Sequence, residues 1–162
     1  ILPEKEWTNK EIAVVRVVES THHRFTKELD IRARKILVGI SGAADGWTDG
    51  NTYIAINRHW LTGIDEGTVQ GLSDIGDLIR HEDCHDESDM GTHEHGPDFL
   101  QKYHDLGRVH SAFVHEAVGR LPQIYRTINR RLTRRQTQEQ DRLVRTAKAT
   151  EDHDRIAARE IT

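Results

Sequence analysis

The sequence predicts an α+β fold in which a small sheet packs with helices and is followed by a helical C-terminal extension. Three observations carry this prediction: a stripe with helical spacing in residues 8–29, two short β-prone runs within residues 35–61, and a polar, helix-prone tail beyond Gly119. The chain has 162 residues, the length of one domain, so we expect a single hydrophobic core.

The first expected element is a helix that begins near residue 9. Thr8 and Glu11 have the spacing of a capping box, and Trp7 and Ile12 flank this cap at the spacing of a hydrophobic staple. A stripe then recurs every three or four positions, formed by Ile12, Val15, Val18, His22, Phe25 and Leu29. This spacing predicts a helix with one face in the core.

Two β-prone runs follow the first helix. The run "KILVGI" covers residues 35–40, and "GWTDGNTYIAINRHWL" (46–61) places Gly and Asp turn residues before an alternating segment. We therefore expect the two runs to form a small sheet.

A second helix is expected in "LSDIGDLIRHEDCHDES", residues 72–88, with Ser73 as its cap. Its helical spacing is set by Leu72, Ile75 and Ile79. The glycine-containing stretch "DMGTHEHGP" (89–97) then interrupts the helix. Pro97 suits the first position of a helix, so a third helix is expected to begin there.

Residues 1–107 are expected to form the core of the domain, and residues 108–162 a helical, partly basic extension of it. The chain has a net charge of -4, yet residues 126–148 hold eight Lys or Arg against two acidic residues. An acidic body therefore carries a basic segment.

Within this basic segment, Arg130, Arg131, Arg134 and Arg135 fall within about one helical turn of one another. Such a stripe is a candidate contact for the phosphates of DNA. The alternative is that the segment packs on the acidic body through Ile128, Leu132 and Leu143. The absence of aromatic residues from 126–162, which would stack on bases, favours that alternative.

The segment richest in chemical groups is "HEDCHDESDMGTHEHGPDF", residues 81–99, with four histidines and seven carboxylates. It begins with the pattern HExxH, formed by His81, Glu82 and His85. On a helix, the two histidines share one face and can bind one ion, while Glu82 lies where it can hold a metal-bound water. The sequence therefore predicts a metal site, and either His93 or His95 is its candidate third ligand.

HExxH followed after a short loop by HGPDF resembles the SprT-like zincin metallopeptidases, whose third ligand is the histidine of an HGxxF-type element. The run "YIAINRHWL" is also similar to the edge strand of that family, so the resemblance covers residues 8–107. It implies a minimal zincin-like domain with a small sheet and an active-site helix. It further implies Zn²⁺ bound by His81, His85 and His95, with Glu82 as the general base and His93 as the alternative ligand.

Two features depart from the family pattern. Asp83 stands where the family usually has a buried Leu, which affects the expected packing of the helix. The zinc ribbon of some members needs four cysteines, and this chain has only Cys84.

The function implied by the resemblance is that of a zinc metallopeptidase, a hydrolase that cleaves peptide bonds by Glu82-assisted attack of a zinc-bound water. The substrate would be a protein or peptide, and family members are associated with cleaving proteins crosslinked to DNA. Tyr103 and Arg108 are candidate stabilisers of the oxyanion. The alternative is a catalytically silent, zinc-stabilised module that binds protein or nucleic acid, which a fourth protein ligand such as His93 would favour.

The remaining polar residues are expected to serve structure or solubility. Cys84 is expected to be a buried helix residue, and Asp86, Glu87 and Asp89 a solvated acidic helix end. Surface or core positions are expected for His22, His23, His59, His104, His110 and His115.

The sequence also indicates a compartment. A single cysteine allows no internal disulfide, which favours a reducing compartment, and we expect a cytoplasmic protein. No apolar run is long enough to cross a bilayer, so no membrane partner is expected. The first residue is Ile rather than Met, so we expect the chain to be part of a longer one.

Overall fold

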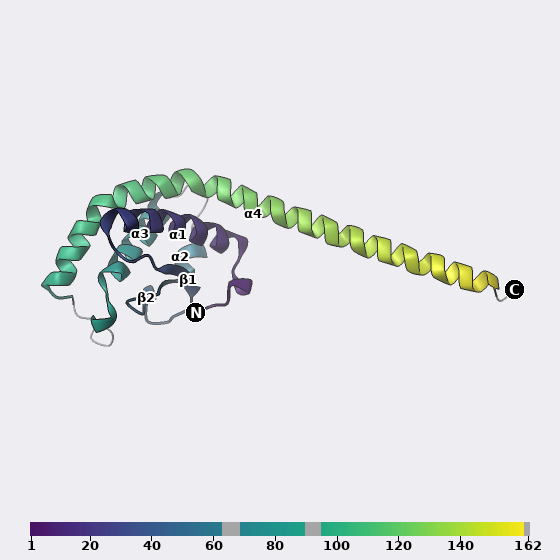
Figure 1. Cartoon of the computed structure of the whole chain (residues 1–162), viewed down its shortest axis with the longest axis horizontal. Coiled ribbons are helices and arrows are strands. Elements are labelled where there is room, and N and C mark those ends of the chain that lie inside the picture. The colour runs from purple at the N-terminus through teal and green to yellow at the C-terminus, as the bar shows by residue number, and fades with distance from the viewer. Residues whose placement is uncertain (63–68, 90–94, 161–162) are drawn as a thin grey trace. The chain divides into compact units, whose positions relative to one another are not determined.

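The computed structural model describes residues 1–62, 69–89 and 95–160, which are mostly helical and include a small mixed sheet. The chain divides into two compact units, Ile1–Tyr125 and Arg126–Thr162. The first unit contains the strands and the shorter helices, as Figure 1 shows. The predicted α+β class is confirmed.

Helix α1 (Asn9–Leu29) follows a short 3-10 turn, η1 (Glu4–Glu6), and begins where the sequence predicts. The capping box is present, because Thr8 Oγ1 accepts from the Glu11 N–H at 3.2 Å and Glu11 Oε2 accepts from the Thr8 N–H at 2.7 Å. The buried Glu11 carboxylate also accepts from Arg58 Nε at 2.6 Å. Arg58 is the first residue of α2 (Arg58–Thr62), so this cap joins two helices.

The sheet has the strand order β1-β3-β2, formed by β1 (Lys35–Gly39), β2 (Gly46–Thr48) and β3 (Tyr53–Asn57). Strands β1 and β3 run parallel, and β2 pairs antiparallel with β3. The sequence predicts two strands, whereas the described residues contain three. The additional strand, β2, lies in the stretch that the sequence assigns to a turn. Both faces of β3 are covered, because residues 54–57 are all buried.

Helix α3 (Val69–Cys84) carries the first four residues of the HExxH pattern in its last turn, and His85 directly follows the helix. The expected apolar face is confirmed, since Leu72, Ile75 and Ile79 are at most 3% exposed. The expected cap is wrong: the helix begins four residues before Ser73, whose Oγ instead lies 3.3 Å from His110 Nε2. A second 3-10 turn, η2 (Glu87–Asp89), follows the helix.

Helix α4 (Pro97–Glu160) begins at Pro97 as predicted and continues as one helix. In the first unit it packs closely on α3, since a Cβ added at Gly76 would lie 3.0 Å from ring carbons of Phe113. Cys84 of α3 forms a small core with Phe99 and Leu106 of α4. This packing brings the start of α4 to the end of α3. Among the described helices, none combines the length and apolarity that crossing a bilayer requires.

Candidate metal centre

Three histidines from the end of α3 and the start of α4 meet at one place. His81 lies in the last turn of α3, His85 directly follows that helix, and His95 precedes α4 by two residues. His81 Nε2 and His85 Nε2 are 3.4 Å apart. One ring nitrogen from each of the three histidines lies within 4.8 Å of the other two. The three side chains therefore lie close enough to bind one metal ion.

The donor set and its protonation also suit a metal. Zinc–imidazole bonds of 2.0–2.1 Å in a tetrahedron place two ligand nitrogens about 3.3 Å apart, close to the His81–His85 separation. Burial, and then the charges of His85 and His95, lower the pKa of His81 below its ordinary value. The neutral imidazole, which is the form that ligates metals, is thereby favoured.

Aromatic rings pack around the imidazoles. The Phe99 ring is stacked on His95 with centroids 4.1 Å apart, and it lies 5.1 Å from His81 and 4.9 Å from His85. Tyr103 stacks on Phe99 at 6.3 Å, and the Arg80 guanidinium carbon lies 3.9 Å from the centre of the Tyr103 ring. Phe99 thus forms an apolar wall that touches all three histidines. Sequence analysis did not identify this role of Phe99.

Glu82 lies between His81 and His85 in the sequence and is 6% exposed. Burial raises the pKa of its carboxyl group to about 7, with a further increase from Asp83 and an opposing effect from Arg34. In the metal-free chain this carboxyl group therefore changes protonation near neutral pH, which suits a group that exchanges protons.

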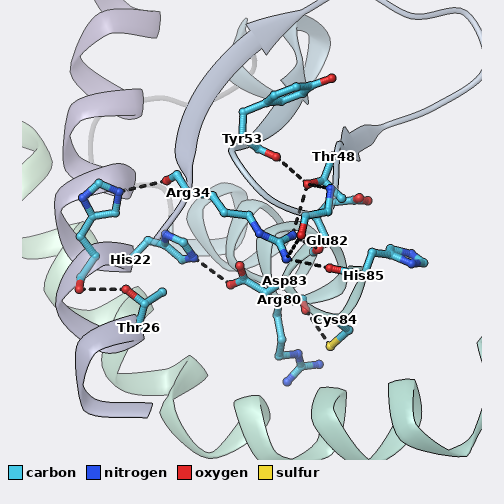
Figure 2. A network of polar contacts seen from close by, with 12 residues as sticks. His22, Thr26, Arg34, Thr48, Tyr53, Arg80, Glu82, Asp83, Cys84 and His85 are labelled. Carbon is cyan, nitrogen blue, oxygen red and sulfur yellow. Dashed lines mark hydrogen bonds and ion pairs between the residues drawn. The ribbon is translucent and has the colours of Figure 1, made fainter. Parts of the chain in front are cut away.

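A buried arginine, Arg34, contacts the end of α3 (Figure 2). Its Nη1 donates to the Glu82 carbonyl oxygen at 2.8 Å, and its Nη2 donates to the His85 carbonyl oxygen at 2.7 Å. The same guanidinium donates to the Gly50 carbonyl oxygen at 2.9 Å and to Thr48 Oγ1 at 3.2 Å. Sequence analysis missed Arg34, because no local motif marks a contact across about fifty residues.

Asp83, the departure from the family pattern, has a partner on α1. His22 Nε2 donates to Asp83 Oδ2 at 2.8 Å, and both side chains are nearly fully buried, as Figure 2 shows. His22 is thus a core histidine, as expected. The pair joins α1 to α3 through a buried polar contact.

We expect Asp83→Leu to lower the free energy of unfolding of the metal-free protein by about 1–3 kcal/mol, because buried His22 loses its acceptor. The double variant His22→Leu/Asp83→Leu removes both polar groups and should regain most of that loss. Urea unfolding followed by circular dichroism measures both. A single variant as stable as the wild type would contradict this role of the pair.

The remaining candidates lie in different surroundings. Cys84 is buried, its Sγ donates to the Arg80 carbonyl oxygen at 3.2 Å, and burial raises the pKa of its thiol to about 11. Asp86 and Glu87 are exposed as expected, but they follow the end of α3 at Cys84 instead of lying in that helix. His93 lies outside the described residues. Apart from His22, the histidines expected at surface or core positions are exposed or half-buried: His23, His59, His104, His110 and His115.

The two oxyanion candidates differ in position. Tyr103 is half-buried, and its ring centroid lies 6.4 Å from that of His81. Arg108 is exposed, and its Nε donates to the Asp105 carbonyl oxygen of the same helix at 3.4 Å. Tyr103 is therefore beside the histidine cluster, whereas Arg108 makes its contact along α4.

The basic segment belongs to the second compact unit. There α4 exposes all four predicted arginines, Arg130, Arg131, Arg134 and Arg135. Of the apolar residues in the packing alternative, Ile128 is 6% exposed and Leu143 is 59% exposed.

The geometry thus defines a class of site, a three-histidine cluster beside a buried glutamate that can bind a metal ion. Comparisons with family models, curated proteins and solved structures find no match for this chain. The functional interpretation therefore rests on the residues and their geometry.

Proposed function

We propose that this chain is a zinc-dependent metallopeptidase of the SprT-like zincin kind. The observation that supports this proposal best is the convergence of His81, His85 and His95 around the end of a helix. Imidazole donors suit several transition metals, so the ligands alone do not select zinc. Zinc is the proposed ion because HExxH with a third histidine is the ligand pattern of zinc peptidases.

His81, His85 and His95 would hold the zinc ion, which when bound would supply Lewis acidity to the scissile carbonyl and to a water molecule. Glu82 accepts the proton of the attacking water and then donates it to the amine nitrogen as the peptide bond breaks. Phe99 packs against one side of the three imidazoles, and burial favours the neutral form of His81. The substrate class is a protein or peptide, with DNA-associated proteins as the first candidates.

Metal analysis and a cleavage assay test this function together. The purified chain is expected to contain about one zinc per chain and to cleave itself at high concentration, or to cleave a DNA-bound protein. A chelator should abolish cleavage, and added zinc should restore it. A zinc-replete chain that cleaves neither substrate would instead favour the catalytically silent module.

A contact with DNA is the second candidate activity, supported by the four exposed arginines of the basic segment. Replacing Arg130, Arg131, Arg134 and Arg135 with Gln should reduce the slope of log affinity against log salt by about 3 to 4, since each neutralised phosphate contributes about 0.9. Fluorescence anisotropy with duplex DNA measures this slope. The control Arg16→Gln, an exposed arginine of α1, should leave the slope unchanged. Binding that does not depend on salt would contradict this proposal.

A further inference from the structure

The backbone of His85 lies at the C-terminal end of α3. His85 lies one residue beyond the last residue of α3. Its N–H donates to the Glu82 carbonyl oxygen at 3.2 Å. The carbonyl groups of a helix end lack partners within the helix and must find donors elsewhere.

Arg34 supplies these donors. It satisfies the carbonyl oxygens of Glu82 and His85 with its two terminal nitrogens, and its positive charge lies at the negative end of the helix dipole. Because Arg34 is only 5% exposed, water competes little for these bonds.

The guanidinium is itself held from the opposite side. Thr48, the last residue of β2, and Gly50, in the turn that follows, accept from the same two nitrogens. This turn touches the chain just after His85, since a Cβ added at Gly50, where φ is +77°, would lie 2.3 Å from the carbonyl carbon of Asp86. A planar fork with donors in fixed directions can meet all four acceptors at once, whereas the single nitrogen of a lysine cannot.

We propose that Arg34 is the positioning residue of the metal centre and holds the His85 peptide in the metal-binding geometry before the metal binds. This inference rests on the proposed metal site. A ligand whose backbone is fixed in advance loses less freedom on binding, whereas a loosely held ligand is displaced from the productive geometry.

The test measures metal affinity and metal geometry in Arg34→Lys and Arg34→Met. Competition with a chromophoric chelator gives the zinc affinity, and the visible spectrum of the Co²⁺-loaded protein reports the ligand geometry. Loss of outer contacts to a metal site typically costs about 10- to 100-fold in affinity, and we expect a loss in this range for Arg34→Lys with an altered Co²⁺ spectrum. Arg34→Met should bind zinc no more tightly than Arg34→Lys.

The control is Val17→Ala, a fully buried substitution in α1 that lowers stability without removing any of these hydrogen bonds. It should lower the melting temperature of the metal-free protein but keep the wild-type zinc affinity and Co²⁺ spectrum. If Arg34→Met fails to fold, Arg34→Lys decides the question. An Arg34→Lys protein with wild-type zinc affinity and spectrum would overturn the positioning role. A wild-type protein that binds neither ion would overturn the metal site itself.

Discussion

Replacing Glu82 with Gln is expected to reduce peptide cleavage by about 10²- to 10⁴-fold while the zinc content stays at the wild-type level. The amide has nearly the same size as the carboxylate, which matters because Glu82 is 6% exposed and a smaller residue would leave a void. It cannot accept the proton of the attacking water. The three imidazoles keep their positions, so only proton transfer is removed. Cleavage rates and elemental analysis of the same preparation measure both quantities.

The matched control is Glu87→Gln, which changes an exposed carboxylate five residues further along the chain. It should cleave at the wild-type rate. Loss of zinc together with activity in Glu82→Gln would show that Glu82 supports the site rather than the proton transfer. Undiminished cleavage by a zinc-replete Glu82→Gln protein would refute the proposed mechanism.

Replacing His95 with Ala is expected to have the largest effect on metal binding. It removes one of three ligands, so zinc affinity should fall by more than the roughly 10- to 100-fold that loss of an outer partner costs. It should also remove the stabilisation by zinc, which amounts to about 4 kcal/mol when free zinc exceeds the dissociation constant 1,000-fold. For a chain of this size that free energy corresponds to roughly 10 °C in melting temperature.

The comparison with His93→Ala decides between the two candidate third ligands. The close approach of His95 to His81 and His85 predicts that His93→Ala binds zinc nearly as tightly as the wild type. Thermal melts of each variant with zinc and with a chelator, together with zinc titrations, measure the difference. A larger loss of affinity in His93→Ala than in His95→Ala would contradict the ligand assignment.

The features that sequence analysis predicted correctly depend on neighbouring residues. The capping box of α1 and the proline start of α4 are local patterns, so their spacing alone fixes the backbone there. The same holds for His81 and His85, whose spacing of four residues at the end of α3 brings their side chains together. The approach of His95 followed from the resemblance of HGPDF to a family pattern, since spacing alone left His93 as an equal candidate.

The features that sequence analysis missed depend on tertiary contacts. Asp83 and His22 are 61 positions apart, and only the packing of α1 on α3 makes a buried aspartate acceptable. Arg34 meets His85 across 51 positions. Strand β2 is three residues long, and its pairing with β3 rather than its composition makes it a strand.

The arrangement of Phe99 among the three histidines has a consequence for magnetic resonance. An aromatic ring shields nuclei above its face and deshields nuclei in its plane. His95 is stacked on the Phe99 ring at an interplanar angle of 20°, whereas His81 meets it at 67° and His85 at 49°. The imidazole protons of His95, which is stacked on this ring, should therefore be shifted upfield. Phe99→Leu should remove this upfield shift, which would assign the shifted signals to His95 and allow this histidine to be followed during a metal titration.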